Sequence, residues 1–160
     1  MADSFTTPEI PDLGIMSALT AEHRRLLSNY GEFLPVQAEQ SIIQEGEEQN
    51  SLYFVISGLL HVHSQTSGKN ILLARIEPGE TLGEVNLFDP TTASASVTAK
   101  EFSQVWKAVR ADLEDFMSEY PDAAAQLLIQ IGSSMSKRIR IMNEKLTMEQ
   151  LKRVHLEYWA

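Results

Sequence analysis

Two histidines on one predicted strand are the side chains best placed for metal chemistry. His61 and His63 are two residues apart in a β-rich run, so both imidazoles lie on the same face of the strand. A metal site built on such a pair needs a carboxylate and a further histidine. Residues 64–76 contain no acidic residue, and the only later histidine is His155. We therefore interpret the pair as part of a solvated strand face.

The chain shows no set of residues for nucleophilic catalysis. It contains no cysteine, which excludes a thiol nucleophile, a thiolate zinc site and a disulfide framework. Ser133, Ser134 and Ser136 lie in a helical pattern with no histidine near them in the sequence, so they are better explained as helix surface. We predict no catalytic residues.

The segment around Gly83 and Glu84 is the most suggestive one for ligand binding. A short helical turn beginning at Gly83 would direct free backbone N–H groups at an anion, and glycine allows the anion to approach closely. Glu84 is an odd partner for an anion. Residues 79–99 contain no Lys or Arg at all.

Length and charge limit the kinds of protein that can carry these residues. The chain has 160 residues, of which 43% are hydrophobic, and this is enough for one domain with an appended helix. The formal net charge of −9 argues against nonspecific binding to nucleic acid. The first residues lack the order of a signal peptide, and no apolar run is long enough for a membrane span. We expect a cytoplasmic protein.

The middle of the chain has the pattern of an all-β sandwich or roll. Short β-rich runs alternate with turn residues about every ten positions. The runs are 42–43, 52–56, 59–62, 71–73 and 94–99, and the turns contain Gly46, Gly58, Gly68, Pro78, Gly79, Asp89 and Pro90.

Helical patterns flank this region on both sides. Residues 1–12 have the composition of a loose arm, and Thr20 is a plausible N-cap for one short helix that ends at Gly31. Asp112 is placed to cap a second short helix, and Pro121 fits the first turn of a third.

The third helix carries an apolar seam close to the 3.5-residue period, formed by Leu128, Ile131, Met135, Ile139, Met142 and Leu146. The seam breaks at Thr147, where Thr147-Met148-Glu149-Gln150 has the pattern of a capping box for a separate terminal helix.

The order and spacing of these motifs resemble the cyclic-nucleotide-binding domain family, in particular the effector domain of catabolite-activator (CRP/FNR) type regulators. The resemblance runs from about residue 19 to residue 145. Its parts are Ile43-x-x-Gly46-Glu47, the run LYFVISG at 52–58, the run PGETLGEVNLF at 78–88, Ala95-x-x-x-Ala99 and the helix end MNEK at 142–145. It implies a mainly β fold with flanking helices, a double-stranded β-helix of jelly-roll type, and a long C-terminal helix for dimerisation.

The resemblance also implies which residues meet a ligand. A cyclic nucleotide would lie inside the roll beneath residues 79–99, which we call the cassette, with Glu84 accepting a hydrogen bond from a ribose hydroxyl. The alternative for Glu84 is a carboxylate satisfied by nearby turn N–H groups. The matching ligand-binding positions are Gly83, Glu84, Val85, Ser94, Ala95 and Asn143, of which Asn143 could pair with a base. No cofactor or metal is expected.

One position departs from the family pattern. The arginine that neutralises the phosphate just before the Ala-x-x-x-Ala strand is Ala93 in this chain. Losing the partner of a buried charge costs about 3 to 5 kcal/mol, which predicts weakened binding of cyclic AMP. Arg75 is the nearest alternative cation, but the apolar residues on both sides of it leave open which face of its strand is interior.

These observations predict a stand-alone regulatory domain that binds a cyclic nucleotide or another effector and signals through movement of its C-terminal helix. We place the domain at residues 1–146, a short terminal helix at 147–160, and a homodimer contact at residues 128–146. No DNA-binding domain and no membrane contact are expected. Two alternatives remain: a degenerate domain that only dimerises or presents a surface to protein partners, and a cupin-type metalloenzyme built on His61 and His63.

Overall fold

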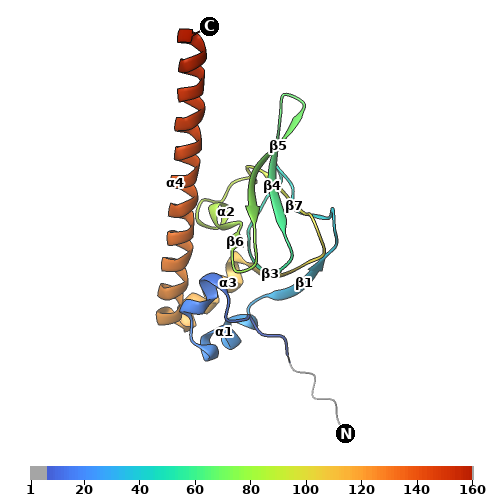
Figure 1. The fold of residues 1–160 in the computed structure, drawn as a ribbon. Helices are drawn as coiled ribbons and strands as arrows, with labels where there is room; N and C mark the ends of the chain where they lie inside the picture. The colour runs from blue at the N-terminus through green and yellow to red at the C-terminus, as the bar shows by residue number, and fades with distance from the viewer. Residues whose placement is uncertain (1–6, 160) are drawn as a thin grey trace.

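Two four-stranded antiparallel sheets form the body of the molecule (Figure 1). The computed structural model describes residues 7–159, and the predicted arm at 1–12 therefore lies partly outside the described residues. One sheet has the strand order β1-β8-β3-β6 and the other β2-β7-β4-β5. The strands are β1 (Glu32–Val36), β2 (Ser41–Ile43), β3 (Ser51–Ser57), β4 (Leu60–Thr66), β5 (Lys69–Ile76), β6 (Thr81–Leu82), β7 (Ser96–Ala99) and β8 (Ser103–Val109). The predicted β-roll is confirmed.

Alternation along the strands divides the roll into an inner and an outer face. Leu60, Ile76, Val97 and Ala99 are buried in one cluster between the sheets. Their neighbours along the strands point the other way, because successive side chains of a strand alternate between faces. The outer face of the second sheet therefore carries the polar residues of β4, β5 and β7.

Helices cover one end and one side of the roll. They are the 3₁₀ helix η1 (Gly14–Ala18) and the α-helices α1 (Ala21–Ser28), α2 (Glu84–Phe88), α3 (Arg110–Glu119) and α4 (Pro121–Trp159). A second apolar cluster lies between these helices and the first sheet. Its fully buried side chains include Trp106, Phe54, Phe116, Leu127 and Ile131. The indole N–H of Trp106 donates to the carbonyl oxygen of Ser28 at 3.4 Å, so this core also fixes α1 against β8.

Local sequence signals account for most helix boundaries. The side chain of Thr20 accepts from the backbone N–H of His23 at 3.1 Å, which confirms Thr20 as the N-cap of α1. Pro121 begins α4 as predicted. Asp112 does not cap α3, because the helix already begins at Arg110 and Asp112 lies in its first turn.

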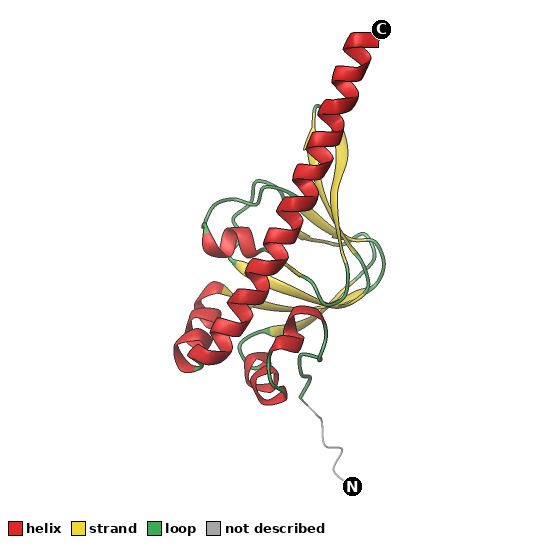
Figure 2. Ribbon diagram, turned by 60° about the vertical axis from the view of Figure 1, so that its left-hand side comes forward, coloured by secondary structure: helices red, strands yellow, loops and turns green. Residues whose placement is uncertain are grey.

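The long helix α4 has no break at Thr147. It runs from Pro121 to Trp159, so the predicted separate terminal helix at 147–160 is wrong as an element. The hydroxyl of Thr147 donates back to the carbonyl oxygen of Asn143 at 2.9 Å, a bond that a threonine inside a helix makes, instead of capping a new helix. The C-terminal turns of α4 project past the roll (Figure 2).

Contacts along α4 divide the predicted apolar seam into two halves. Ile131 is fully buried in the core next to the first sheet, and Met135 packs against the same core. Ile139, Met142 and Leu146 are 56%, 60% and 60% exposed. Ile131 and Met135 thus serve the chain's own core, where Leu127 takes the place predicted for the half-buried Leu128, and the second half of the seam is largely uncovered by the described residues. No helix in the described residues is long and apolar enough to cross a membrane.

Candidate functional site

The short helix of the cassette follows a glycine that no other residue can easily replace. Gly83 has φ +86°, the left-handed region, and precedes the five-residue helix α2. A Cβ at this position would collide with the carbonyl oxygen of Ser51. Gly83 therefore allows β6 to turn into α2 directly against β3, which fixes the direction of Glu84.

Glu84 is buried and paired with a residue of α4. Its side chain is only 3% exposed, and its Oε1 accepts from Nη1 of Arg138. The other guanidinium nitrogen, Nη2, donates to the carbonyl oxygen of Thr81 and lies 3.9 Å from Oε1 of Glu80. One arginine of the long helix thus contacts three residues of the cassette.

The electrostatics of this contact are unusual for a salt bridge. Burial raises the pKa of Glu84, and the charge and hydrogen bond of Arg138 do not offset that effect fully. The neighbouring Glu80 raises the pKa further. Burial therefore disfavours the charged form of Glu84, and the guanidinium of Arg138 on α4 opposes this effect in part.

Two buried polar atoms at this contact have no partner. They are Oε2 of Glu84 and Oγ1 of Thr81, and they are the only such side-chain atoms in the described part of the chain. Buried polar groups are nearly always hydrogen-bonded, so an exception calls for a reason. Both atoms lie within the segment that Arg138 contacts.

The remaining cassette forms a closed loop. Asn86 donates from Nδ2 to the carbonyl oxygens of Thr91 and Thr92 at 2.9 and 3.0 Å. Ala93 donates its backbone N–H to the carbonyl oxygen of Glu47 at 2.8 Å, and its side chain is buried in the core of the roll. Position 93 thus faces the interior and contributes no charge there.

The other predicted site residues lie in different surroundings. Val85 is 54% exposed on α2, Ser94 is exposed, and Ala95 is half-buried before β7. Asn143 is exposed on α4. It follows Arg138 by five residues, so at about 100° per residue it points about 140° away from the face that meets the cassette. The structure brings Gly83, Glu84 and Val85 together and leaves Asn143 apart.

Arg75 does not replace the missing arginine. Its neighbours Ala74 and Ile76 both pack in the core of the roll, which places Arg75 on the outer face of β5. It lies opposite His61 in the strand register. The cation at the cassette is Arg138 instead, which the sequence analysis did not identify. A usable signal was present, because Arg138 is seven residues, or two helical turns, after the buried Ile131 and so shares its face.

Comparison with known proteins agrees with this geometry. The family model of the cyclic nucleotide-binding domain matches residues 33–120. The chain belongs to the cyclic nucleotide-binding domain family. The predicted resemblance and the predicted fold are therefore confirmed.

Individual relatives are distant and mostly longer. The chain is 26% identical to the cAMP-activated global transcriptional regulator CRP of Salmonella typhimurium, over 68% of this chain and 51% of CRP. It is 26% identical to glutaminase 1 of Bradyrhizobium diazoefficiens, over 90% of this chain and 23% of the glutaminase. The chain thus spans about a quarter to a half of these curated relatives. A cyclic nucleotide-binding domain from Methylobacillus flagellatus has the same fold, with a TM-score of 0.77 at 19% identity over 82% of this chain and 74% of that domain.

Proposed function

We propose that this chain is a regulatory domain that binds a small effector at the cassette and passes the signal on by moving α4. The observation that carries the proposal is the contact of Arg138 with Glu84 and Thr81, because it links the ligand segment of the family to the long helix. The related regulator CRP is described as cAMP-activated, which makes a cyclic nucleotide the first effector to test. We expect no enzymatic activity from this domain itself.

The proposed movement follows from competition for Glu84. Its Oε1 is occupied by Arg138 and its Oε2 is buried without a partner. A ligand hydroxyl that donates to this carboxylate supplies the missing hydrogen bond and alters the strength of the ion pair between Glu84 and Arg138. The ligand must bind one position of α4 more tightly than the other, since equal affinity shifts no population.

The charge of the cassette limits the affinity for a cyclic nucleotide. Residues 79–99 contain no Lys or Arg, and Ala93 occupies the interior position where a phosphate partner would stand. Arg138 is the nearby cation, and it already faces Glu84 and Glu80. We therefore expect cyclic nucleotides to bind weakly, with Gly83, Glu84, Val85, Ser94 and Ala95 forming the contact.

The exposed half of the seam supports a homodimer. Ile139, Met142 and Leu146 are spaced three and four residues apart on one stripe of α4 and are each more than half exposed. A stripe of this kind packs well against the same stripe of a second copy. Asn143 lies beside this stripe, so in such a dimer its side chain would lie close to α4 of the second copy.

Calorimetric titration with cyclic AMP and cyclic GMP tests the binding step. We expect saturable binding that weakens about tenfold or more in Glu84→Ala, as when a buried hydrogen bond to a charged group is lost. Glu101→Ala is the matched control, because Glu101 is an exposed carboxylate outside the cassette. Equal weakening in both variants would argue against a site at Glu84.

Spin labels test the movement. Because the chain has no cysteine, single cysteines introduced at Glu101 and Glu144 carry labels at known positions. The proposal expects the distance distribution between the β7–β8 turn and α4 to change on saturation with nucleotide. An unchanged distribution in a saturated sample would disprove signalling through α4 while leaving the binding intact.

The second candidate function is a dimerisation module without an effector. It is favoured by the absence of a free cation in the cassette, since Arg138 is already paired. Under this alternative, neither nucleotide produces heat at millimolar concentration, and the protein still dimerises through α4.

A further inference from the structure

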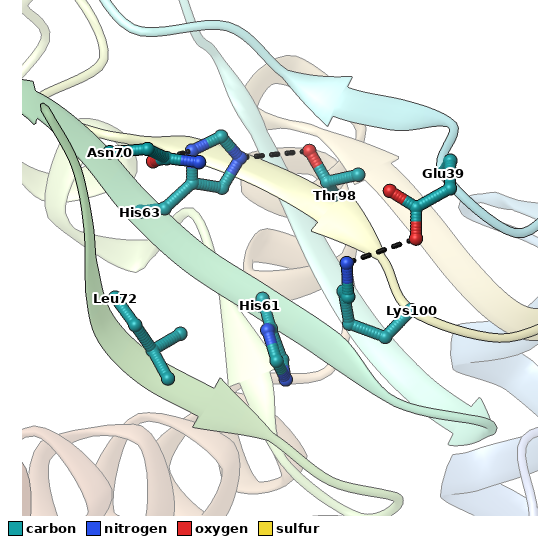
Figure 3. Close-up of a pocket in the computed structure, with 7 residues that line it drawn as sticks. All are labelled: Glu39, His61, His63, Asn70, Leu72, Thr98 and Lys100. Carbon is teal, nitrogen blue, oxygen red and sulfur yellow. Dashed lines mark hydrogen bonds and ion pairs between the residues drawn. The ribbon is translucent and has the colours of Figure 1, made fainter. Parts of the chain in front are cut away.

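A hollow on the outer face of the second sheet lies away from the cassette. It has a volume of about 220 Å³ and is formed between β4, β5, β7 and the turns that flank them (Figure 3). The residues that line it are Glu39, His61, His63, Asn70, Leu72, Thr98 and Lys100. The regulatory function proposed above uses none of them.

One wall of the hollow is a fixed chain of hydrogen bonds. His63 contacts Oδ1 of Asn70 through Nδ1 and Oγ1 of Thr98 through Nε2, both at 2.9 Å. The hydroxyl of Thr98 lies 2.8 Å from that of Ser41. Both ring nitrogens of His63 are thus engaged, which holds its ring in place (Figure 3).

His61 is different, because its ring has no hydrogen-bond partner within the described residues. It lies beside Lys100 and opposite Arg75 in the register of β4 with β5. Burial, Arg75 and Lys100 lower the pKa of His61, in that order, and Glu39 opposes them only in part. The ring therefore stands in a positive local field on a protein with a net charge of −9.

Lys100 is the strongest donor in the hollow, and it has one anionic partner. Its Nζ is 2.9 Å from Oε1 of Glu39, and both side chains are well exposed. An ammonium group has three donors, so this ion pair leaves donor capacity on the side of the hollow. Exposed pairs of this kind are also weak and exchange their partners readily.

The dimensions and the donors select the kind of ligand. Pockets for drug-sized ligands have volumes of about 300 to 1,000 Å³. The hollow of about 220 Å³ therefore suits a ligand smaller than a nucleotide. A metal ion is disfavoured, since no group of three or more metal-ligating side chains occurs in residues 7–159 and both nitrogens of His63 are engaged. A small anion in the hollow would meet Lys100 and the ring of His61, with the charge of Arg75 nearby on β5.

We infer that this hollow is a binding site for a small oxyanion, with phosphate and carboxylate groups as its ligand class. His61 and Lys100 donate to the bound oxygens, and Arg75 adds long-range attraction. The fixed ring of His63 and the side chain of Leu72 form the remaining walls. An anion whose charge does not change binds more tightly as the pH falls, because protonated His61 attracts it. The charged and titratable groups that face this ring are Arg75, Lys100, Glu39 and His63.

Proton NMR of the histidine rings tests the site directly. The chain has four histidines, so the signals of His61 and His63 can be followed during titration with inorganic phosphate and, in a separate arm, with acetate. Chloride at equal ionic strength serves as the reference. We expect saturable shifts of His61 and His63, and smaller effects at His23 and His155. In the acetate arm, where the ligand keeps its charge at mildly acidic pH, we expect the affinity to rise several-fold as the pH falls and His61 becomes protonated.

Three variants separate this site from adventitious binding. Lys100→Gln weakens phosphate binding about fivefold, and Lys152→Gln, which alters an exposed, ion-paired lysine of α4, leaves it unchanged. Glu39→Gln strengthens binding by a similar factor, because it removes the competing carboxylate. A gain of affinity cannot come from misfolding. Shifts that grow linearly with ionic strength, or that are equal in Lys100→Gln and Lys152→Gln, would overturn the proposal.

Discussion

Arg138 on α4 and Glu84 on α2 form an ion pair although they are 54 positions apart in the chain. The pair joins α2, which follows the left-handed Gly83, to α4, whose C-terminal turns project past the roll (Figure 2). Arg138 is therefore the side chain of α4 that contacts Glu84 directly.

Removal of the arginine is expected to destabilise the protein and loosen α4. In Arg138→Gln the buried carboxylate of Glu84 loses its charged partner, and we expect a loss of about 1 to 3 kcal/mol in the free energy of unfolding. Denaturant unfolding measures the loss, and hydrogen exchange locates it in α4 and the cassette. Arg140→Gln is the matched control, since Arg140 is exposed two residues later on the same helix. Equal losses in the two variants would show that the contact carries no stability.

The pH dependence of stability reports on the same carboxylate. The pKa of Glu84 is raised in the folded protein, chiefly by burial, so the folded state binds its proton more readily than the unfolded state does. The contribution of Glu84 to stability therefore increases as the pH falls through the raised pKa and is complete below the unfolded value. We expect the stability difference between the wild type and Glu84→Gln to change in favour of the wild type on going from neutral to acidic pH. Thermal unfolding of both proteins across that range measures it, and a difference that is independent of pH would contradict the assignment.

Substitution of two glycines with almost the same φ distinguishes the cost of backbone strain from the cost of a steric collision. Gly46 has φ +85° and Gly83 has φ +86°, but a Cβ at Gly46 would meet no atom within 4 Å, whereas one at Gly83 would collide with Ser51. Gly46→Ala is expected to cost about 1 to 2 kcal/mol, the price of a left-handed residue with a side chain. Gly83→Ala should cost clearly more and should also displace Glu84 from Arg138. Chemical denaturation of the two variants side by side decides this, and equal costs would mean that β3 and the cassette can move apart freely.

The sequence predicted the roll well because its determinants are local. Turn glycines, alternating strands and the caps at Thr20 and Pro121 each depend on a few neighbouring residues. The capping-box pattern at Thr147 was misleading because the same hydroxyl can bond to the preceding turn and leave the helix intact.

The site was harder to predict because its main contact is not local. The sequence identified Gly83 and Glu84, but the partner of Glu84 is on a helix that begins 37 residues after it. In the sequence Arg138 is one of several basic residues on the last helix, and only its face on α4 distinguishes it from Arg140. Which face of β5 carries Arg75 also could not be predicted, because apolar residues occupy both faces of this strand. The pairing register with β4 decides it.

The exposed half of the seam gives the last prediction. Leu146 and Ile139 are seven residues apart, so both lie on one stripe of α4, and a charge on each would place like charges against each other in a homodimer. We expect the double variant Ile139→Asp, Leu146→Asp to be monomeric at concentrations where the wild type is a dimer in analytical ultracentrifugation. Its fold should be unchanged, because neither side chain belongs to the two cores. Phe102→Asp is the control, since Phe102 is 51% exposed on the β7–β8 turn and lies away from α4 in the chain. If the double variant sediments as the wild type does, α4 is not the dimer contact, and the exposed seam must serve another partner.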